Sequence, residues 1–158
     1  MRPVWTIRPY GAADHQAVTQ LADRLLIGMP RWRDRDRWLA AVRQWVSQST
    51  QEAGEATSGL LVVTENERVA GFVSLSTRSH FTGDIDAYIG ELVVAEWAEG
   101  RGAGCALLQA AEEWAMVNGH QRVTLETGAA NDRARRFYAR AGYLDEDVRL
   151  TKSLPARR

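Results

Sequence analysis

Residues 92–104 read LVVAEWAEGRGAG, and this stretch decides the fold of the chain. An apolar, strand-like run ends at Val94 and leads into a turn that contains Gly100, Gly102 and Gly104, and a helical stretch follows. Glycine lets the main chain turn tightly and direct several N–H groups at one anion, and the helix adds the positive end of its dipole. The order strand, glycine turn and helix therefore predicts a cradle for a diphosphate.

The glycine turn taken alone also fits a simple reversal of the chain, because glycines are common in turns. Its spacing differs from the P-loop, which ends in Gly-Lys-Ser/Thr, and from the dinucleotide motif G-x-G-x-x-G. A second motif is therefore needed to identify the ligand.

That motif is the helix predicted by residues 131–143, NDRARRFYARAGY, in which Asn131 is a suitable N-cap. The helix and the glycine turn together resemble the GNAT superfamily of acyl-CoA-dependent N-acyltransferases. The helix matches the pattern Asn-x-x-Ala-x-x-Phe-Tyr-x-x-x-Gly-Phe/Tyr at every defined position. Gly102 and Gly104 match the glycines of the pattern Gln/Arg-x-x-Gly-x-Gly/Ala, but its leading position is Glu99 here.

The resemblance implies direct transfer of an acetyl group from acetyl-CoA, as co-substrate, to a primary amine in a ternary complex, without a metal. In this superfamily the strand before the glycine turn separates from its neighbour, and its free backbone binds the pantetheine arm and polarises the thioester carbonyl. The residues that the resemblance assigns to the cofactor are Leu92, Val93, Val94, Gly100, Arg101, Gly102, Ala103, Gly104, Cys105, Asn131, Ala134 and Tyr138.

Two residues are candidates for proton transfer. Strand alternation puts Leu92 and Val94 on the face that packs under a helix, and Glu91 and Val93 on the other. The Glu91 carboxylate would then face the substrate and could take a proton from the attacking ammonium directly or through water. Binding of a cationic substrate, or a salt bridge, would explain Glu91 as well. The resemblance assigns Tyr138 to protonation of the departing thiolate, although a helical tyrosine can also be a core residue.

Three residues at the glycine turn have alternative interpretations. A carboxylate beside a diphosphate is unfavourable, so we expect Glu99 to turn its side chain outward and to contribute backbone only. Arg101 is then the expected side-chain partner of the phosphate, and a solvated loop cation is the alternative. Cys105 opens the helix, where a thiolate could be stabilised, but a small packing residue is the favoured interpretation.

The acceptor amine is expected to meet the first two helices and the turn at residues 79–86. These segments supply Trp32, Asp84 and Asp86 as candidate substrate residues, beside Glu91. Acidic groups next to aromatic rings suit a small cationic amine, such as a polyamine or an aminoglycoside. The alternatives are solubilising loop aspartates, a protein N-terminus or lysine as acceptor, and a non-catalytic CoA-binding sensor or interaction module.

The remaining sequence predicts an α/β protein with a mixed sheet, in the order β-α-α-β-β-β-α-β-α-β, and helices on both faces. The predicted strands are Val4–Arg8, Leu60–Thr64, Val69–Ser76, Ala87–Val94, Val123–Thr127 and Val148–Leu154, and the predicted helices are Ala12–Leu26, Arg35–Gln48, Gly104–Asn118 and Asn131–Ala141. We expect residues 1–158 to form one N-acetyltransferase domain.

Composition limits the partners. The 20 basic and 20 acidic residues cancel, so no global field favours nucleic acid or an anionic membrane. One cysteine fits a reducing compartment, and neither a signal peptide nor a membrane-spanning run is evident. His80 and His120 lack metal-ligand partners at suitable spacing. We therefore expect a soluble, cytoplasmic protein that binds acetyl-CoA and an amine, with a homodimer left open.

Overall fold

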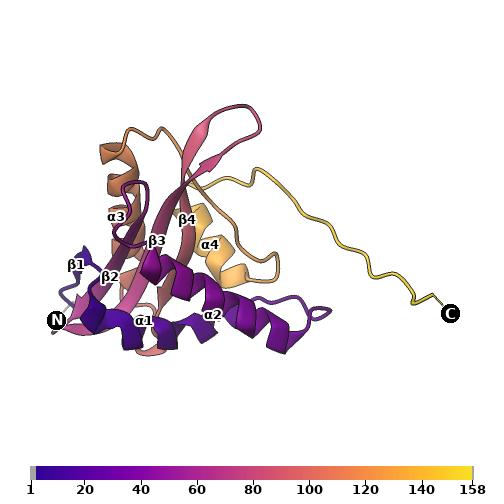
Figure 1. The fold of residues 1–158 in the computed structure, drawn as a ribbon, viewed down its shortest axis with the longest axis horizontal. Helices are drawn as coiled ribbons and strands as arrows, with labels where there is room; N and C mark the ends of the chain where they lie inside the picture. The colour runs from indigo at the N-terminus through magenta and orange to yellow at the C-terminus, as the bar shows by residue number, and fades with distance from the viewer. Residues whose placement is uncertain (1–2, 158) are drawn as a thin grey trace.

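A computed structural model describes residues 3–157 of the chain. Its elements are a five-stranded sheet, four α-helices and three short 3-10 helices (Figure 1). In chain order they are β1 (Thr6–Pro9), η1 (Ala12–Asp14), α1 (His15–Leu21), η2 (Ala22–Leu26), α2 (Arg35–Gln51), β2 (Gly59–Glu65), β3 (Arg68–Ser79), β4 (Ile85–Val94), η3 (Glu96–Ala98), α3 (Ala103–Val117), β5 (Val123–Leu125) and α4 (Asp132–Arg140).

The strands lie in the order β1-β2-β3-β4-β5, and each pairs with its chain neighbour. The first three pairings are antiparallel, and β4 and β5 are parallel because α3 connects them on one face of the sheet. Asn66 and Glu67, at φ 48° and 65°, join β2 to β3. Positive φ at both central residues is typical of the type I′ turns that close two-residue hairpins.

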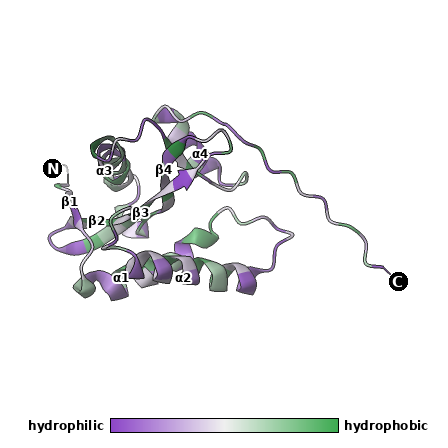
Figure 2. Cartoon of the chain, turned by 45° about the horizontal axis from the view of Figure 1, so that its top comes forward, coloured by the Kyte–Doolittle hydropathy of each residue, from purple (hydrophilic) through white to green (hydrophobic). Residues whose placement is uncertain are grey.

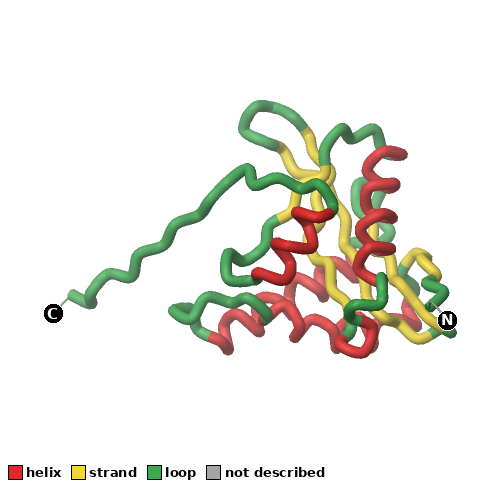
Figure 3. Tube along the Cα trace, turned by 180° about the vertical axis from the view of Figure 1, so that it is seen from behind, coloured by secondary structure: helices red, strands yellow, loops and turns green. Residues whose placement is uncertain are grey.

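Helices cover both faces of the sheet, as the sequence predicts (Figure 3). On one face α3 contributes Leu107, Leu108 and Ala111 to a buried cluster with β2, β3 and β4, and Phe137 of α4 packs at its edge. On the other face Val18 of α1 and Val46 of α2 pack against Phe72 and other strand residues. The core therefore consists of two apolar layers separated by the sheet.

Most of the predicted elements are confirmed, with shifted bounds. The predicted helix Ala12–Leu26 is a short α-helix between two 3-10 segments, and the helix predicted to end at Gln48 continues to Gln51. Glycines at φ 80° and 93° follow α3 and α4, at Gly119 and Gly142, as helix C-termini favour. Val42 and Val46 of α2 are buried, whereas Trp45 is 52% exposed.

The predicted closing strand, Val148–Leu154, is wrong for the isolated chain. Residues 144–157 have no regular structure and extend away from the sheet. Strand-prone residues alone do not make a strand, because its backbone N–H and C=O groups need a neighbouring strand to pair with. Within residues 3–157, β5 is the last strand of the sheet.

An ion pair fixes the connection between β1 and α1. Asp14 is only 5% exposed, and its carboxylate accepts two hydrogen bonds from the Arg8 guanidinium, at 2.7 and 2.8 Å. The same carboxylate accepts from the backbone N–H of Gly11 at 2.9 Å. These bonds outweigh the effect of burial and hold the pKa of Asp14 below its ordinary value.

Replacement of Asp14 by asparagine should destabilise the fold by about 1.5 kcal/mol, the scale of a hydrogen bond to a charged group. A lowered pKa means that the carboxylate stabilises the folded state above its unfolded-state pKa, and that this contribution is lost as the pH falls through the folded-state pKa. Urea unfolding of the wild type and Asp14→Asn should therefore differ at pH 7 and converge toward pH 3. A difference that persists at pH 3 would show that the ion pair is not its cause.

Candidate active site

The site begins where β4 separates from β5. The two strands pair at Ala87, Tyr88 and Ile89 and no further, so β4 continues alone on that side from Gly90 to Val94. On its other side β4 has a bulge, because Val73 pairs with Leu92 and Leu75 with Ile89, which leaves Gly90 and Glu91 opposite Ser74. The second half of β4 therefore has one backbone edge free of β5.

The bulge brings the Glu91 carboxylate between two serines. The Ser74 hydroxyl accepts a hydrogen bond from the Glu91 backbone N–H at 2.8 Å and donates to the Glu91 carboxylate. Ser49 of α2 donates to the same carboxylate at 3.0 Å. Glu91 is only 6% exposed. It lies on the α1 and α2 side of the sheet with Val93, whereas Leu92 and Val94 pack on the α3 side, as alternation predicts.

Burial governs the protonation of Glu91. Removal from water disfavours the carboxylate and raises the pKa of Glu91 above its ordinary value of 4.5, and the hydrogen bonds from Ser74 and Ser49 oppose this shift. A buried acid with a raised pKa beside a cavity is typical of functional sites. Such a group can accept a proton near neutral pH more readily than an exposed glutamate.

A cavity of about 100 Å³ lies where β4 and β5 separate. It brings together five of the predicted site residues from β4 and from the region of α4: Glu91, Leu92, Asn131, Ala134 and Tyr138. The sequence alone does not single out the other residues that line the cavity: Leu25, Ile89, Gly90, Leu125, Glu126 and Thr127. Glu91 and Tyr138, the two candidates for proton transfer, thus share one cavity.

Tyr138 is held by its aromatic neighbours. Its ring lies edge-on to Phe137 and Tyr143, with centroid separations of 5.1 and 5.6 Å. Burial raises the pKa of Tyr138 to about 12. The phenol is therefore protonated throughout the physiological range, as a proton donor must be. The Tyr143 hydroxyl instead donates to Glu112 at 3.1 Å.

The glycine turn lies between β4 and α3. Gly100 and Gly102 have φ of 70° and 95°, a backbone conformation that favours glycine, and Gly102 is the N-cap of α3. Gly102 has no side chain to cap the helix, so the first N–H groups of α3 are not satisfied in this way. A Cβ on Gly104 would lie 3.5 Å from Phe137, so this position brings α3 close to α4.

Charged side chains surround the turn in an arrangement that the sequence did not predict. Glu99 does not turn away into solvent; its carboxylate forms ion pairs with Arg24 of η2 and Arg133 of α4. The two guanidiniums attract this carboxylate and keep it close to the protein surface. Arg101 pairs instead with Glu65 of β2, at 2.8 Å.

The loop after η2 packs directly on the start of α4. Gly28 has a φ of 83°, and a Cβ there would lie 2.5 Å from the Cβ of Asn131. The Asn131 side chain accepts a hydrogen bond from the backbone N–H of Ala134 at 3.2 Å, which makes it the N-cap of α4. Only glycine allows this approach, so η2 and its loop cover one side of the cavity.

Other predicted site residues lie outside the cavity. Cys105 is exposed on α3, Trp32 is exposed in the loop before α2, and Asp84 is exposed in the hairpin loop, 3.6 Å from Arg122. Asp86 is buried in β4 opposite Arg78. These side chains do not line the cavity that contains Glu91 and Tyr138.

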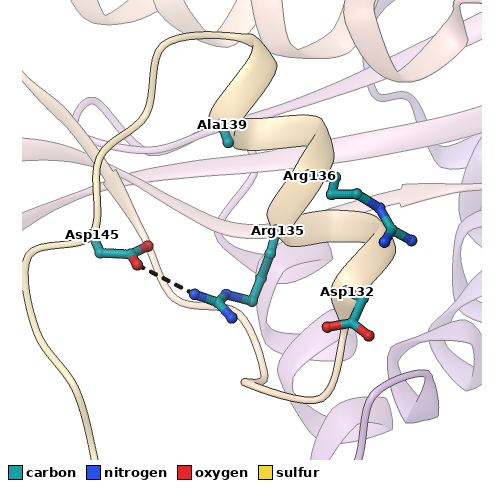
Figure 4. Close-up of a pocket in the computed structure, with 5 residues that line it drawn as sticks. All are labelled: Asp132, Arg135, Arg136, Ala139 and Asp145. Carbon is teal, nitrogen blue, oxygen red and sulfur yellow. Dashed lines mark hydrogen bonds and ion pairs between the residues drawn. The ribbon is translucent and has the colours of Figure 1, made fainter.

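No group of three or more His, Cys, Asp or Glu side chains is placed to hold a metal ion between residues 3 and 157. None of the helices in this range has the length and apolar character needed to cross a membrane. A larger hollow of about 270 Å³ lies on the outer face of α4, lined by Asp132, Arg135, Arg136, Ala139 and Asp145, and contains neither Glu91 nor Tyr138 (Figure 4).

The buried carboxylate should lower the stability of the fold at neutral pH. Because the folded-state pKa of Glu91 is raised, the protonated form stabilises the fold below the unfolded-state pKa, and this contribution is lost as the pH rises through the folded-state pKa. Glu91→Gln, which is neutral at every pH, should therefore be more stable than the wild type at pH 8 and should lose that advantage near pH 4.

Thermal unfolding at both pH values would measure this difference. Glu113→Gln, an exposed change on α3, serves as the matched control and should give little difference at either pH. If Glu91→Gln were less stable than the wild type at pH 8, the ionised carboxylate would be a net stabilising group.

Comparison with known proteins identifies the family of the chain. The model of the acetyltransferase (GNAT) family matches residues 17–143, which include β4, the glycine turn and α4. The uncharacterised N-acetyltransferase YhfO of Bacillus subtilis is 36% identical over 92 residues, 58% of this chain and 61% of that protein. The aminoalkylphosphonate N-acetyltransferase of Salmonella typhimurium is 36% identical over 94 residues, 56% of this chain and 58% of that protein.

The alignments thus span about three fifths of the length of these relatives. The crystal structure of PaiA N-acetyltransferase from Thermoplasma acidophilum, in complex with coenzyme A, has the same fold, with a TM-score of 0.75 and 16% identity over 92% of this chain and 93% of that one. The chain belongs to the acetyltransferase (GNAT) family.

Proposed function

We propose that this protein is an N-acetyltransferase that moves the acetyl group of acetyl-CoA directly to a primary amine. One observation carries the proposal: β4 leaves β5 after Ile89 beside a cavity lined by both Glu91 and Tyr138. Family membership and the coenzyme A complex of PaiA N-acetyltransferase support acetyl-CoA as the donor.

The glycine turn fits the diphosphate of the donor. The first N–H groups of α3 lack a capping side chain, and the space beside Gly100 is open, whereas a Cβ at Gly102 would lie 3.7 Å from the Trp5 indole nitrogen. Backbone donors at a helix N-terminus are suited to bind phosphate oxygens. The free edge of β4 from Gly90 to Val94 could pair with the pantetheine amides, and a backbone N–H there could polarise the thioester carbonyl.

Glu91 is the proposed base. Attack on the thioester carbonyl requires a neutral amine, so the ammonium must first lose a proton. At 6% exposure, and with serines on two sides, the carboxylate is poorly accessible to a bulky amine. We therefore infer that the proton reaches Glu91 through water. Ser49 and Ser74 hold the carboxylate in place.

Tyr138 is the proposed acid. When the C–N bond has formed and the C–S bond breaks, the departing sulfur gains negative charge. A phenol with a pKa of about 12 is fully protonated and can donate its proton to that thiolate. Solvent then returns a proton to the phenolate, and Glu91 releases its proton to solvent.

The cavity must enlarge before the donor enters. At about 100 Å³ it is smaller than the roughly 300–1,000 Å³ typical of ligand pockets. The ion pairs of Glu99 join the glycine turn to η2 and α4, so they oppose separation of these elements. We infer that the diphosphate takes the place of the Glu99 carboxylate between Arg24 and Arg133, and that the cavity widens once Glu99 no longer holds these two guanidiniums.

The proposed acceptor is a small cationic amine. Glu126 lines the cavity, although it is paired with Arg78 at 2.7 Å. The relative from Salmonella acts on aminoalkylphosphonates, which carry an amine and an anionic group, so these compounds belong in a screen with polyamines and aminoglycosides. A protein N-terminus or lysine, and a non-catalytic CoA sensor, are the alternatives; Glu99 beside the diphosphate position favours the sensor.

An amine screen with acetyl-CoA, measured as thiol release, tests the function. With an accepted amine, Glu91→Gln and Tyr138→Phe should each lower turnover by roughly a hundredfold, the scale of general acid–base catalysis. Acetyl-CoA affinity measured by calorimetry should hardly change. A donor with a more acidic leaving thiol should recover part of the rate of Tyr138→Phe but not that of Glu91→Gln.

Tyr143→Phe is the matched control, because its ring touches Tyr138 but its hydroxyl is bound to Glu112. It should retain most of the turnover. Acetyl-CoA binding without thiol release for any amine would favour the sensor. A rate for Tyr138→Phe equal to that of the wild type at every pH would place the acid elsewhere.

Removal of the charge on Glu99 should tighten donor binding. Glu99→Gln leaves Arg24 and Arg133 free for the diphosphate, so the Kd of acetyl-CoA should fall about tenfold, equivalent to about 1.4 kcal/mol. Calorimetry would measure the Kd, and raising the salt concentration should reduce the gain.

Glu65→Gln is the control on the other side of the turn, because it frees Arg101 instead. We expect little change in the Kd of acetyl-CoA for Glu65→Gln. If Glu65→Gln tightened binding and Glu99→Gln did not, Arg101 would be the phosphate partner.

A further inference from the structure

Trp5 contacts the glycine turn from the β1 edge of the sheet. It directly precedes β1, which lies beside α3 in Figures 1 and 2. Its half-buried indole donates a hydrogen bond through Nε1 to the backbone carbonyl of Arg101, at 2.9 Å. A Cβ on Gly102 would lie 3.7 Å from the same nitrogen. Trp5 is thus a contact of the turn that lies outside the sequence motifs at residues 99–104 and 131–143.

Aromatic and charged neighbours hold the Trp5 ring in place. Its centroid lies 6.3 Å from that of Trp97 in η3, and the Arg101 guanidinium lies 5.4 Å from it. Arg101 also pairs with Glu65, and Arg68 covers the Trp97 ring at 4.1 Å. These contacts restrict the rotation of the indole. Both the side chain and the backbone carbonyl of Arg101 are therefore held on the Trp5 side of the turn.

The hydrogen bond to Arg101 sets the direction of the next N–H group. In a trans peptide the carbonyl and the N–H point in opposite directions, and all peptide bonds within residues 3–157 are trans. Because the Arg101 carbonyl points to Trp5, the N–H of Gly102 points away from Trp5. The bond therefore occupies the carbonyl side of this peptide and leaves its N–H side free for a ligand.

The N–H groups of the turn need such a constraint. Among residues 3–157, no acceptor binds the backbone N–H groups of residues 100–105. Gly100 and Gly102 have positive φ, and glycine adopts either sign of φ readily. Without a fixed contact the Arg101–Gly102 peptide could rotate, and a ligand would have to order it on binding. Such ordering lowers affinity, so a contact that orients the peptide beforehand favours the ligand.

We propose that Trp5 is a positioning residue that directs the Gly102 N–H at the diphosphate of acetyl-CoA before the donor binds. The inference rests on the proposed function, because it takes the glycine turn as the diphosphate site. Trp5 contacts the turn and not the reacting atoms, so it acts on donor affinity and leaves the chemical step unchanged. It acts only on ligands that carry the diphosphate, and this selectivity separates positioning from general support of the fold.

Two ligands test the role of Trp5. Trp5→Phe keeps a ring against Trp97 and Arg101 but removes the N–H donor. Calorimetry should show the Kd of acetyl-CoA rising about tenfold, the scale of one lost hydrogen bond. The Kd of S-acetylpantetheine, which lacks the diphosphate, should stay the same in an NMR titration. Trp97→Phe is the matched control and should change neither Kd, because Trp97 packs on Trp5 without bonding to the turn among residues 3–157.

Hydrogen exchange on the wild type gives a second measurement that needs no variant. The Trp5 indole proton should exchange with solvent more slowly than that of Trp32, which is 61% exposed. Equal exchange rates, or an unchanged Kd of acetyl-CoA in Trp5→Phe, would overturn the inference. Weaker binding of both ligands would overturn it too, because Trp5 would then be a structural residue only.

Failure of the proposed function gives a different result. If the wild type binds no acetyl-CoA, the glycine turn is not the donor site, and the inference falls together with the function. If the wild type binds acetyl-CoA and Trp5→Phe binds it equally well, the inference alone is overturned.

Discussion

The separation of β4 from β5 is the constraint on which the rest of the site depends. Parallel pairing ends at Ile89, and the bulge at Gly90 and Glu91 changes the path of β4 at the same level. The bulge adds a residue opposite Ser74 and so turns the Glu91 carboxylate toward α2. Because β4 forms no hydrogen bonds with β5 beyond Ile89, backbone groups along the second half of β4 are left without partners from β5. A ligand with amide groups could satisfy them, and for this reason we propose this edge as the site of the pantetheine arm.

We propose that the buried charge of Glu91 serves the reaction at some cost in stability. Within residues 3–157 no cationic side chain pairs with Glu91, and the two hydroxyls that hold its carboxylate compensate for desolvation less well than a guanidinium does. Asp14, which is buried to the same extent, has Arg8 opposite it, and its pKa moves in the other direction. The contrast separates a structural carboxylate from the one that we propose as the base.

The features that could be predicted from the sequence are those that depend on interactions between residues close together in the chain. The glycine turn, the Asn131 cap and the alternation of Leu92 and Val94 all depend on neighbours a few residues away. Ser49 and Ser74 carry no such signal, because only the packing of α2 and β3 against the bulge brings them to Glu91. The same holds for Arg24, which contacts Glu99, and for Gly28, which contacts Asn131. Both partners lie far away in the chain.

The Val148–Leu154 prediction shows the limit of a local pattern. Alternation sets which face of a strand is apolar, but not which backbone edge will pair with it, because pairing is a relation between two segments. Here the apolar residues alternate as expected, but the segment has no neighbouring strand among residues 3–157. Within that range the sheet ends at β5, a strand of three residues that borders the cavity. The strand character of the segment and the open edge of β5 are set by different residues, so the alternation that predicts the one carries no information on the other.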